Sequence, residues 1–202
     1  MNKNIIIIFV RNPELGKVKT RLSKTIGKED ALKIYRILLE HTESVLRKIS
    51  SDKVVYYSEE IQKNDLWDAS IYQKKLQKGT DLGARMQMAF ETAFKDSYEK
   101  VVIVGSDLFD LKPIHIEKAF EALENHDVVL GPSLDGGYYL LGMTKRHPFL
   151  FKNKQWGTDS VLESTLKDLK EHNVTLLEAL NDIDTFEDLQ NQSKLLKKIT
   201  KL

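Results

Sequence analysis

The chain has 202 residues, of which 41% are hydrophobic and 30% are charged, a composition typical of a folded globular protein rather than a disordered one. Its formal net charge of +1 argues against nucleic acid as the main partner, and the absence of cysteine excludes disulfides, thiolate metal sites and cysteine nucleophiles. The apolar run Ile5 to Val10 is too short for a signal peptide core or a membrane span, so we expect a cytoplasmic protein without a membrane span.

The hydrophobic pattern predicts strands alternating with helices along the chain. The predicted strands are short β-branched runs, and the predicted helices carry apolar residues every three or four positions. In chain order the predicted elements are strand 5–10, helix 28–49, strand 54–57, strand 71–76, helix 81–94, strand 101–104, helix 113–124, strands 127–130 and 136–143, helix 159–171, strand 174–177 and helix 186–199. This alternation predicts one α/β domain, residues 1–202, with a mainly parallel sheet.

Basic side chains follow the first predicted strand, which ends at Val10. The loop carries four cations around a single glycine, namely Arg11, Lys17, Lys19 and Arg21. Ligands of open α/β sheets bind at the carboxyl ends of the strands, so these cations are candidates for holding phosphate oxygens. The alternative is a solvated basic loop, and the P-loop pattern GxxxxGK[ST] is absent.

A carboxylate follows the predicted strand 101–104. Gly105 permits a sharp turn there, and Ser106 and Asp107 then lie at the edge of the sheet that also receives the basic loop. A carboxylate beside phosphate oxygens suits Mg²⁺. The alternative for Asp107 is that it caps a turn.

A second acidic segment, NDIDTFEDL at residues 181–189, precedes the last predicted helix and contains Asp182 and Asp184. Capping of the helix explains one of its acidic side chains but not all of them. The phosphatase pattern DxDx[TV] does not fit, because position 186 is phenylalanine and little chain follows to build that fold.

Two glycine-containing segments and a tryptophan are further candidates for ligand contact. In QKGTDLGARM, at residues 77–86, the candidate nucleotide contacts are Gly79, Asp81, Gly83 and Arg85. In GPSLDGGYYLLGM, at residues 131–143, the candidates are Asp135, Gly136 and Gly137, and Trp156 is a possible stacking platform. The alternatives are a helix cap, a hairpin turn and a core tryptophan, respectively.

Taken together, the segments FVRNPELGKVKTRL, GTDLGARM, GSDLFDL, GPSLDGGYYLLGM, WGTDSVL and DIDTFEDL resemble those of a bacterial transferase family. Its members are identified as glycosyltransferases, some of the arsenosugar-biosynthesis or radical-SAM-associated type. The family is similar in fold to the GT-A nucleotide-diphospho-sugar transferases and to the guanylyltransferases of molybdenum-cofactor and phospholactate metabolism. The resemblance implies a single-domain, three-layer α/β/α fold with a mixed, mostly parallel sheet.

The same resemblance implies roles for individual residues. It implies that the nucleotide phosphates are contacted by Arg11, Lys17, Lys19 and Arg21. It also implies that Asp107 and Asp184 hold a Mg²⁺ or Mn²⁺ ion, and Asp135 is a candidate for binding or deprotonating the acceptor. The sequence departs from the family at Phe109 and Phe186, where the family tends to have proline.

The expected activity is a metal-dependent transfer from a nucleotide donor to a small-molecule acceptor. We expect a glycosyltransferase that uses a nucleotide-diphospho-sugar, because the loop after the first strand lacks the glycine-rich LxGGxGxR pattern usual in nucleotidyltransferases. The alternatives are a guanylyltransferase-like nucleotidyltransferase that releases pyrophosphate from a nucleoside triphosphate, and a non-catalytic nucleotide-binding protein on the same fold. A dinucleotide dehydrogenase is disfavoured because GxGxxG is missing after the first strand.

Overall fold

The computed structural model describes residues 3–199. Its strands and helices are, in chain order, β1 (Asn4–Val10), α1 (Thr20–Ile26), α2 (Lys28–Leu46), β2 (Asp52–Tyr57), β3 (Gln73–Leu76), α3 (Leu82–Lys95), β4 (Lys100–Val104), α4 (Pro113–Ala122), β5 (Val128–Pro132), β6 (Tyr138–Met143), the 3-10 helix η1 (Pro148–Phe151), α5 (Val161–Asp168), β7 (Val174–Leu176), α6 (Phe186–Asn191) and α7 (Ser193–Ile199). None of the helices in this part of the chain is long and apolar enough to cross a membrane.

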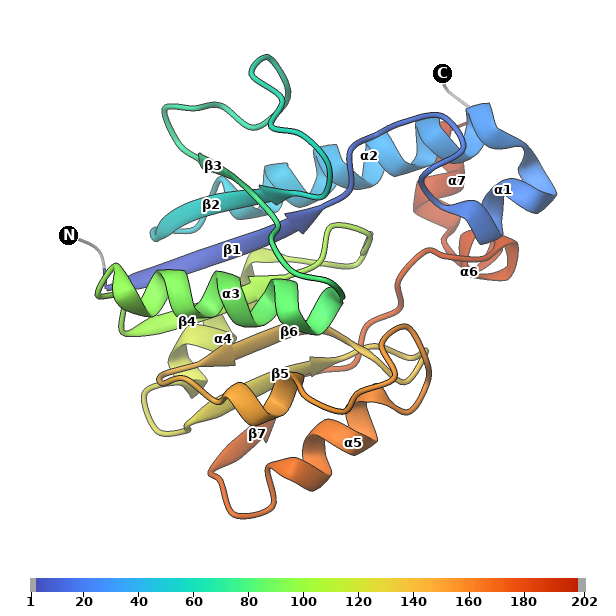
Figure 1. The fold of residues 1–202 in the computed structure, drawn as a ribbon. Helices are drawn as coiled ribbons and strands as arrows, with labels where there is room; N and C mark the ends of the chain where they lie inside the picture. The colour runs from blue at the N-terminus through green and yellow to red at the C-terminus, as the bar shows by residue number, and fades with distance from the viewer. Residues whose placement is uncertain (1–2, 200–202) are drawn as a thin grey trace.

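The seven strands form one sheet in the order β3-β2-β1-β4-β6-β5-β7 (Figure 1). Strand β6 is antiparallel to both of its neighbours, β4 and β5, and the other paired strands run parallel. The predicted α/β fold with a mixed, mostly parallel sheet is therefore confirmed.

Helices cover both faces of this sheet and make three layers (Figure 1). On one face, α2 and α4 contribute Tyr35, Leu39, Ile116 and Phe120 to a core cluster. On the other face, α3 and η1 contribute Met86, Phe90, Leu150 and Phe151, and Leu162 and Leu166 of α5 pack against that cluster. A third cluster joins α1 and α2 to the last two helices.

Strand β1 lies at the centre of the parallel part of the sheet because its side chains are apolar on both sides. Ile6 and Ile8 belong to the core that α2 and α4 cover, and Ile5 and Ile7 belong to the opposite core. Alternate residues of a strand face opposite sides of a sheet, so a continuous isoleucine run requires cover on both faces.

Apart from small shifts of their ends, the helices differ from the sequence prediction in three places, one of which is the 3-10 helix η1 that was not predicted. Helix α1 was not predicted, because its seven residues bury only Leu22 and no side chain caps its first turn. The predicted helix 186–199 is two helices, since Gln192 adopts φ −102° and ψ 72° between them. Other predicted signals were right: Pro113 stands in the first turn of α4, and Asp81 caps α3 by accepting a hydrogen bond from the Ala84 N–H.

The carboxyl ends of β1, β4 and β5 and the amino end of β6 meet at one edge of the sheet, because β6 runs in the opposite direction. The segment between β7 and α6 then crosses this edge. Its Leu180 forms a parallel bridge with Ser133, and the Ile183 N–H donates to the Asp107 carbonyl over 3.1 Å. In Figure 1 this segment runs from β7 to α6, which lies beside α1. Acidic residues far apart in the sequence are thereby brought together.

Candidate active site at the carboxyl edge of the sheet

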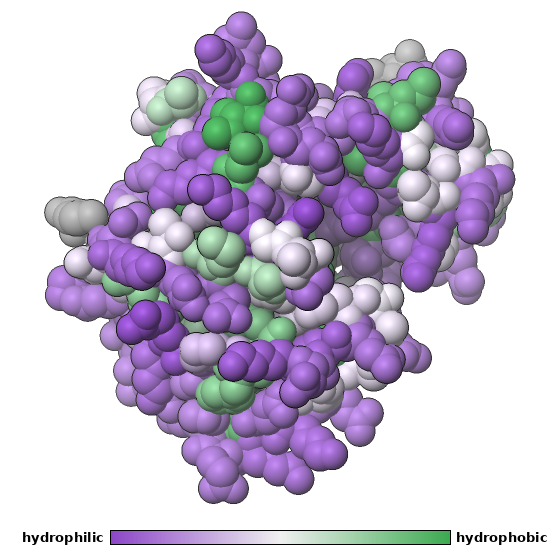
Figure 2. All heavy atoms as spheres, viewed as in Figure 1, coloured by the Kyte–Doolittle hydropathy of each residue, from purple (hydrophilic) through white to green (hydrophobic). Residues whose placement is uncertain are grey.

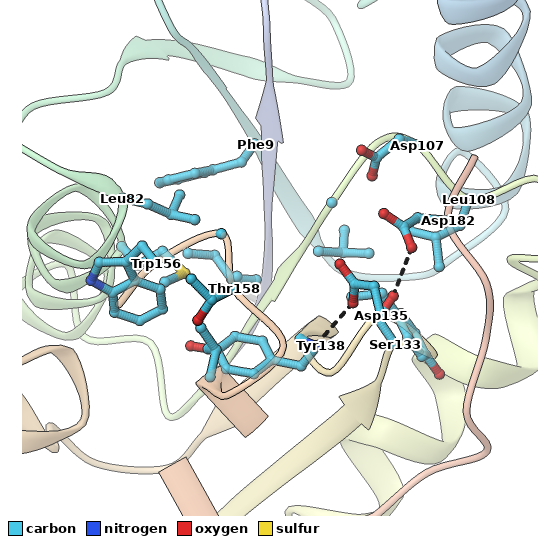
Figure 3. A pocket seen from close by; sticks show the side chains of 18 residues that line it. Phe9, Leu82, Asp107, Leu108, Ser133, Asp135, Tyr138, Trp156, Thr158 and Asp182 are labelled. Atoms are coloured by element: carbon cyan, nitrogen blue, oxygen red, sulfur yellow. Dashed lines mark hydrogen bonds between the residues drawn. The ribbon is translucent and has the colours of Figure 1, made fainter. Parts of the chain in front are cut away.

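The carboxyl edge of the sheet carries a cavity of about 230 Å³. Figure 2 shows this side of the molecule hollowed to the right of centre, between the region of α1 and α6 and the region of α5. The residues that line the cavity come from β1, the start of α3, the end of β4, the β5–β6 loop, residues 156–161 and the segment before α6. In the close-up, Phe9, Leu82, Trp156, Thr158 and Tyr138 lie on one side and Asp107, Asp182, Asp135 and Ser133 on the other (Figure 3).

Lys19 connects the basic loop to the acidic side chains. Its backbone is left-handed, with φ 47° and ψ 47°, and its side chain is only 4% exposed. The Lys19 Nζ lies 2.9 Å from Asp107 Oδ2 and 3.7 Å from Asp184 Oδ1. Arg21 adds a 3.3 Å ion pair to Asp184. The two carboxylates expected to share a metal ion therefore face the same crevice, with an ammonium group between them.

The electrostatic surroundings of Asp107 favour its ionised form. Burial alone raises the pKa of a carboxyl, but the charge of the Lys19 ammonium and its hydrogen bond act in the opposite direction. Arg11 contributes in the same sense, and the pKa of Asp107 lies below its ordinary value. Asp107 is consequently a carboxylate at neutral pH, and its side chain is 39% exposed.

Asp182 lies on the same side of the cavity as Asp107 (Figure 3), and the sequence prediction did not include it in the metal site. Its Oδ1 accepts a hydrogen bond from the Ser133 hydroxyl over 3.1 Å. Burial, followed by the charges of Asp107 and Asp135, raises the pKa of Asp182 to about 6. The D-x-D spacing of Asp182 and Asp184 could have indicated it, because residues two apart in an extended segment face the same side.

The donor chemistry of the acidic side chains suits a shared metal site only in part. Within residues 3–199, no three histidine, aspartate or glutamate side chains converge closely enough to hold a metal ion unaided. Asp107 and Asp182 offer two mutually repelling carboxylates that border one cavity. Two carboxylates completed by phosphate oxygens and water are the usual surroundings of Mg²⁺, so this pair fits such an ion.

The other predicted phosphate contacts are arranged around β1. Arg11 is exposed, and its backbone N–H donates to the Tyr35 hydroxyl over 2.9 Å. Lys17 is exposed as well, and its ammonium pairs with Glu14 at 2.7 Å. Ser106 is buried, with its hydroxyl 3.4 Å from the Tyr35 oxygen. Arg11 and Lys17 therefore remain accessible to a ligand, whereas Ser106 belongs to the support beneath the loop.

Arg85, predicted as a nucleotide contact, holds the turn before α3. Its Nε donates to the Gly79 carbonyl over 3.3 Å, and its Nη1 donates to Gln77 Oε1 over 3.2 Å. The Gln77 amide in turn donates to the carbonyls of Val10 and Tyr56. This network fixes residues 77–81 against the ends of β1 and β2, so the guanidinium positions the turn.

Asn12 performs the same task for the loop after β2, and the sequence prediction missed it. The side chain is 3% exposed; its Nδ2 donates to the Glu60 carbonyl over 2.9 Å, and its Oδ1 accepts from the Glu59 N–H over 3.1 Å. A buried asparagine with both ends of its amide paired ties two loops together. A single asparagine in a polar loop carries no sequence signal for this contact.

Glycine allows two close approaches at the cavity. A Cβ on Gly83 would lie 2.5 Å from the Trp156 Nε1, so Trp156 packs directly against the first turn of α3. Gly136 has φ +86° and faces the Asp159 backbone, where a Cβ would lie 2.6 Å from the Cα. Asp135 accepts a hydrogen bond from the Gly137 N–H over 2.9 Å, as in the predicted turn.

The two phenylalanines at which the sequence departs from the resembling family lie away from the cavity. Phe109 is buried in the cluster that joins α1, α2 and the last helices, with its ring 4.9 Å from that of His41. Phe186 begins α6 and is 37% exposed, while Thr185 caps this helix. Neither residue is among those that line the cavity in the described part of the chain.

Residues 41–158 of this chain match a protein family described as "Uncharacterized protein conserved in bacteria (DUF2064)". Among curated proteins, the chain is 26% identical over 189 residues to the 2-phospho-L-lactate guanylyltransferase of Methanocaldococcus vulcanius, covering 91% of this chain and 82% of the relative. The corresponding enzyme of Methanocaldococcus sp. (strain FS406-22) is 28% identical over 181 residues, covering 87% and 75%.

Among solved structures, a candidate nucleotide-diphospho-sugar transferase from Desulfovibrio desulfuricans G20 superposes with a TM-score of 0.83 at 29% identity, covering 98% of this chain and 99% of that one. The inositol-1-phosphate CTP transferase from T. maritima shares the fold, with a TM-score of 0.59 at 18% identity over 97% and 96% of the chains. So does Rv0371c of Mycobacterium tuberculosis H37Rv in complex with manganese, with a TM-score of 0.56 at 13% identity over 96% and 99%. The chain is thus related to transferases that use nucleotides, and the two guanylyltransferases favour the nucleotidyltransferase alternative over the expected glycosyl transfer.

Proposed function

The chain belongs to this bacterial DUF2064 family, and we propose that it is a metal-dependent nucleotidyltransferase that releases pyrophosphate from a nucleoside triphosphate. Support comes from the two guanylyltransferases to which it is similar over most of its length. The observation that carries the proposal is the buried Lys19 ammonium, which lies between Asp107 and Asp184 beside the cavity. The predicted connection with arsenosugar biosynthesis stays a prediction.

In this proposal the basic loop binds the triphosphate. A nucleoside triphosphate carries about four negative charges at neutral pH, and these are expensive to desolvate without partners. The loop supplies four cations, Arg11, Lys17, Lys19 and Arg21, and the proposed ion would add positive charge, because Lys17, Lys19 and Arg21 already pair with carboxylates. Lys19 has a left-handed backbone, a conformation that non-glycine residues keep only when their surroundings enforce it, as is frequent at functional sites.

Asp107 and Asp182 would hold a Mg²⁺ or Mn²⁺ ion in this proposal, and Asp184 would keep Lys19 and Arg21 oriented towards the phosphates. The bound ion would neutralise charge on the α-phosphate and on the departing pyrophosphate. An acceptor oxygen then forms a bond to the α-phosphorus while the bond from that phosphorus to the bridging oxygen breaks. Asp135, at the cavity end of the site, faces the acceptor.

Ligand-dependent melting temperature tests this function. GTP with Mn²⁺ should raise the melting temperature more than GTP alone, because a ligand that binds only the folded state stabilises it by RT ln(1 + [L]/Kd). ATP, CTP, UTP, UDP-glucose and GDP-mannose belong in the same series, and pyrophosphate release should follow with a suitable acceptor. A rise with the sugar nucleotides and none with any triphosphate would overturn the proposal in favour of glycosyl transfer.

Asp107→Asn should abolish the Mn²⁺-dependent part of the rise and reduce turnover by at least a hundredfold. The matched control is Asp110→Asn, because Asp110 accepts a hydrogen bond from the Gln192 side chain and does not line the cavity. Equal responses of the two variants would contradict the role of Asp107.

A further inference from the structure

The cavity lies to one side of the proposed phosphate site. Its lining includes Asp107 but no residue of the loop 11–21 within the described chain. A triphosphate held by the cations of that loop therefore leaves the cavity free for the second reactant. The residues that line the cavity then indicate which chemical groups the acceptor can carry.

One wall of the cavity is apolar and aromatic. Phe9, Leu82, Tyr138 and Trp156 form this wall (Figure 3). Trp156 is fixed by its contact with Gly83, where any side chain would collide with the indole. The Tyr138 hydroxyl is buried without a hydrogen-bond partner among the described residues, so this residue presents its ring. Such a wall accommodates the apolar face of an organic group.

The opposite wall is acidic. Asp107, Asp135 and Asp182 line it, and no lysine, arginine or histidine lines the cavity among residues 3–199. Asp107 is paired with Lys19, but no ion pair involves Asp135 in that part of the chain. The charges of Asp107 and Asp135 already act unfavourably on Asp182. With the proposed ion bound by Asp107 and Asp182, Asp135 would still have no cation beside it, so another anion placed next to Asp135 would meet an uncompensated carboxylate.

We infer that the part of the acceptor that enters this cavity carries no negative charge: it is an uncharged hydroxyl-bearing group or an amine, with an apolar face against Trp156. The inference rests on the proposed function. It separates this chain from its curated relatives, which are named for 2-phospho-L-lactate, because the carboxylate of that molecule would face Asp135. Either acceptor group satisfies the wall, because a carboxylate accepts hydrogen bonds from hydroxyls and ammonium groups alike.

With a phosphomonoester as the acceptor, the transfer forms one bond to phosphorus and breaks another. One of its phosphate oxygens forms the new bond to the α-phosphorus of the triphosphate. The bond between that phosphorus and the bridging oxygen breaks, and its electron pair leaves on pyrophosphate. The acceptor phosphate stays at the cation-bearing side of Asp107, and only the organic remainder enters the cavity.

Three phosphomonoesters test the inference: α-D-glucose 1-phosphate with an uncharged ring, phosphocholine with a cation, and 2-phospho-L-lactate with a carboxylate. GTP binding in the presence of Mn²⁺ is measured first by calorimetry, and pyrophosphate release is then measured with each acceptor. At least one of the first two should show a kcat/KM tenfold or more above that of 2-phospho-L-lactate. An equal or better 2-phospho-L-lactate overturns the inference, and so does the failure of both other acceptors while GTP binds. Absence of GTP binding instead counts against the proposed function itself.

Two variants locate the selection. Asp135→Asn should reduce the discrimination against 2-phospho-L-lactate at least threefold, whereas Asp159→Asn, an exposed carboxylate outside the cavity lining, should leave the ratio unchanged. Trp156→Ala should raise the KM of the preferred acceptor at least tenfold with the GTP Kd within twofold of the original, and Trp156→Phe should restore most of the loss. A parallel rise in the GTP Kd would show that the cavity holds the nucleoside, and would overturn the inference, as would an unchanged ratio in Asp135→Asn.

Discussion

At the scale of single residues, the site is defined by how unequally its carboxylates are compensated. Asp107 and Asp184 share the Lys19 ammonium, and Asp184 has Arg21 in addition. Asp182 has one neutral donor, the Ser133 hydroxyl, and two carboxylates whose charges act on it. Asp182 is therefore the side chain whose charge state responds most readily to a bound cation.

The raised pKa of Asp182 predicts a pH-dependent effect of its removal. Its pKa rises from 3.8 to about 6 on folding, so between these values the folded chain binds a proton that the unfolded chain does not. Stability is then lost as pH rises through this window, and the ionised carboxylate is destabilising above it. Asp182→Asn should raise the free energy of unfolding by about 1–2 kcal/mol at pH 7.5 and by much less at pH 4.

Urea denaturation at the two pH values measures this difference. Asp184→Asn is the control, because it loses ion pairs with Lys19 and Arg21 and should not be more stable than the original chain at pH 7.5. If Asp182 also holds the proposed metal ion, Asp182→Asn should lose the melting-temperature rise produced by GTP with Mn²⁺. An equally large effect of Asp182→Asn at both pH values would contradict the electrostatic explanation.

At the scale of elements, the β5–β6 loop is held to the start of α5 by backbone contacts. The Leu162 N–H donates to the Gly136 carbonyl over 2.9 Å, and the Asp159 backbone occupies the space beside the Gly136 Cα. This contact fixes Asp135 relative to Trp156, because Asp135 adjoins Gly136 and Trp156 belongs to the segment that leads into α5. The aromatic and acidic walls of the cavity thus depend on one glycine.

Two glycines with similar backbone conformations distinguish the cost of a left-handed backbone from the cost of a steric clash. Gly136 and Gly157 have φ +86° and +82°, but a Cβ on Gly157 would meet nothing within 4 Å. Gly157→Ala should lower the free energy of unfolding by about 1 kcal/mol, from the left-handed backbone alone. Gly136→Ala should lower it by about 3 kcal/mol or more, because the added methyl group displaces the Asp159 backbone. Equal losses in urea denaturation would show that the two segments are not in contact in solution.

At the scale of the whole molecule, the segment before α6 completes the site from the far end of the sheet. It leaves the edge strand β7, crosses β5 and reaches the end of β4 (Figure 1). Ile183, between the two acidic side chains, is fully buried in the cluster that joins α1 and α2 to the last helices. The position of the acidic segment consequently depends on the packing of the terminal helices against α1 and α2.

Ile183→Ala should lower the free energy of unfolding by about 2–4 kcal/mol, the usual loss for a fully buried isoleucine. Leu176→Ala is the control, since Leu176 is 48% exposed on β7 and its loss should be well under half as large. In the same Ile183→Ala protein, the Kd for GTP with Mn²⁺ should rise, because the carboxylates on either side of Ile183 lose their fixed position. A wild-type Kd in a strongly destabilised Ile183→Ala protein would show that the segment does not contribute to the site.

The sequence by itself determined the strands and most of the helices. A β-branched run such as Ile5 to Val10 has a period and composition that need cover on both faces, and local signals such as Asp81 and Pro113 specify where a helix begins. It also placed the basic loop and Asp107 at one edge, because parallel strands end together. The short helix α1 and the break at Gln192 escaped prediction, since each depends on few residues with weak local preferences.

Only the tertiary structure decided which side chains meet. Lys19 lies buried between Asp107 and Asp184, which are remote in the chain. Arg85 holds a turn that Gln77 ties to the end of β1, and Asn12 pairs with the loop after β2, so these contacts also involve segments distant in sequence. The same holds for Asp182, whose raised pKa comes from burial and from Asp107 and Asp135. Electrostatic interactions depend on distance in space and on burial, and local sequence patterns specify neither for residues that different strands bring to one edge.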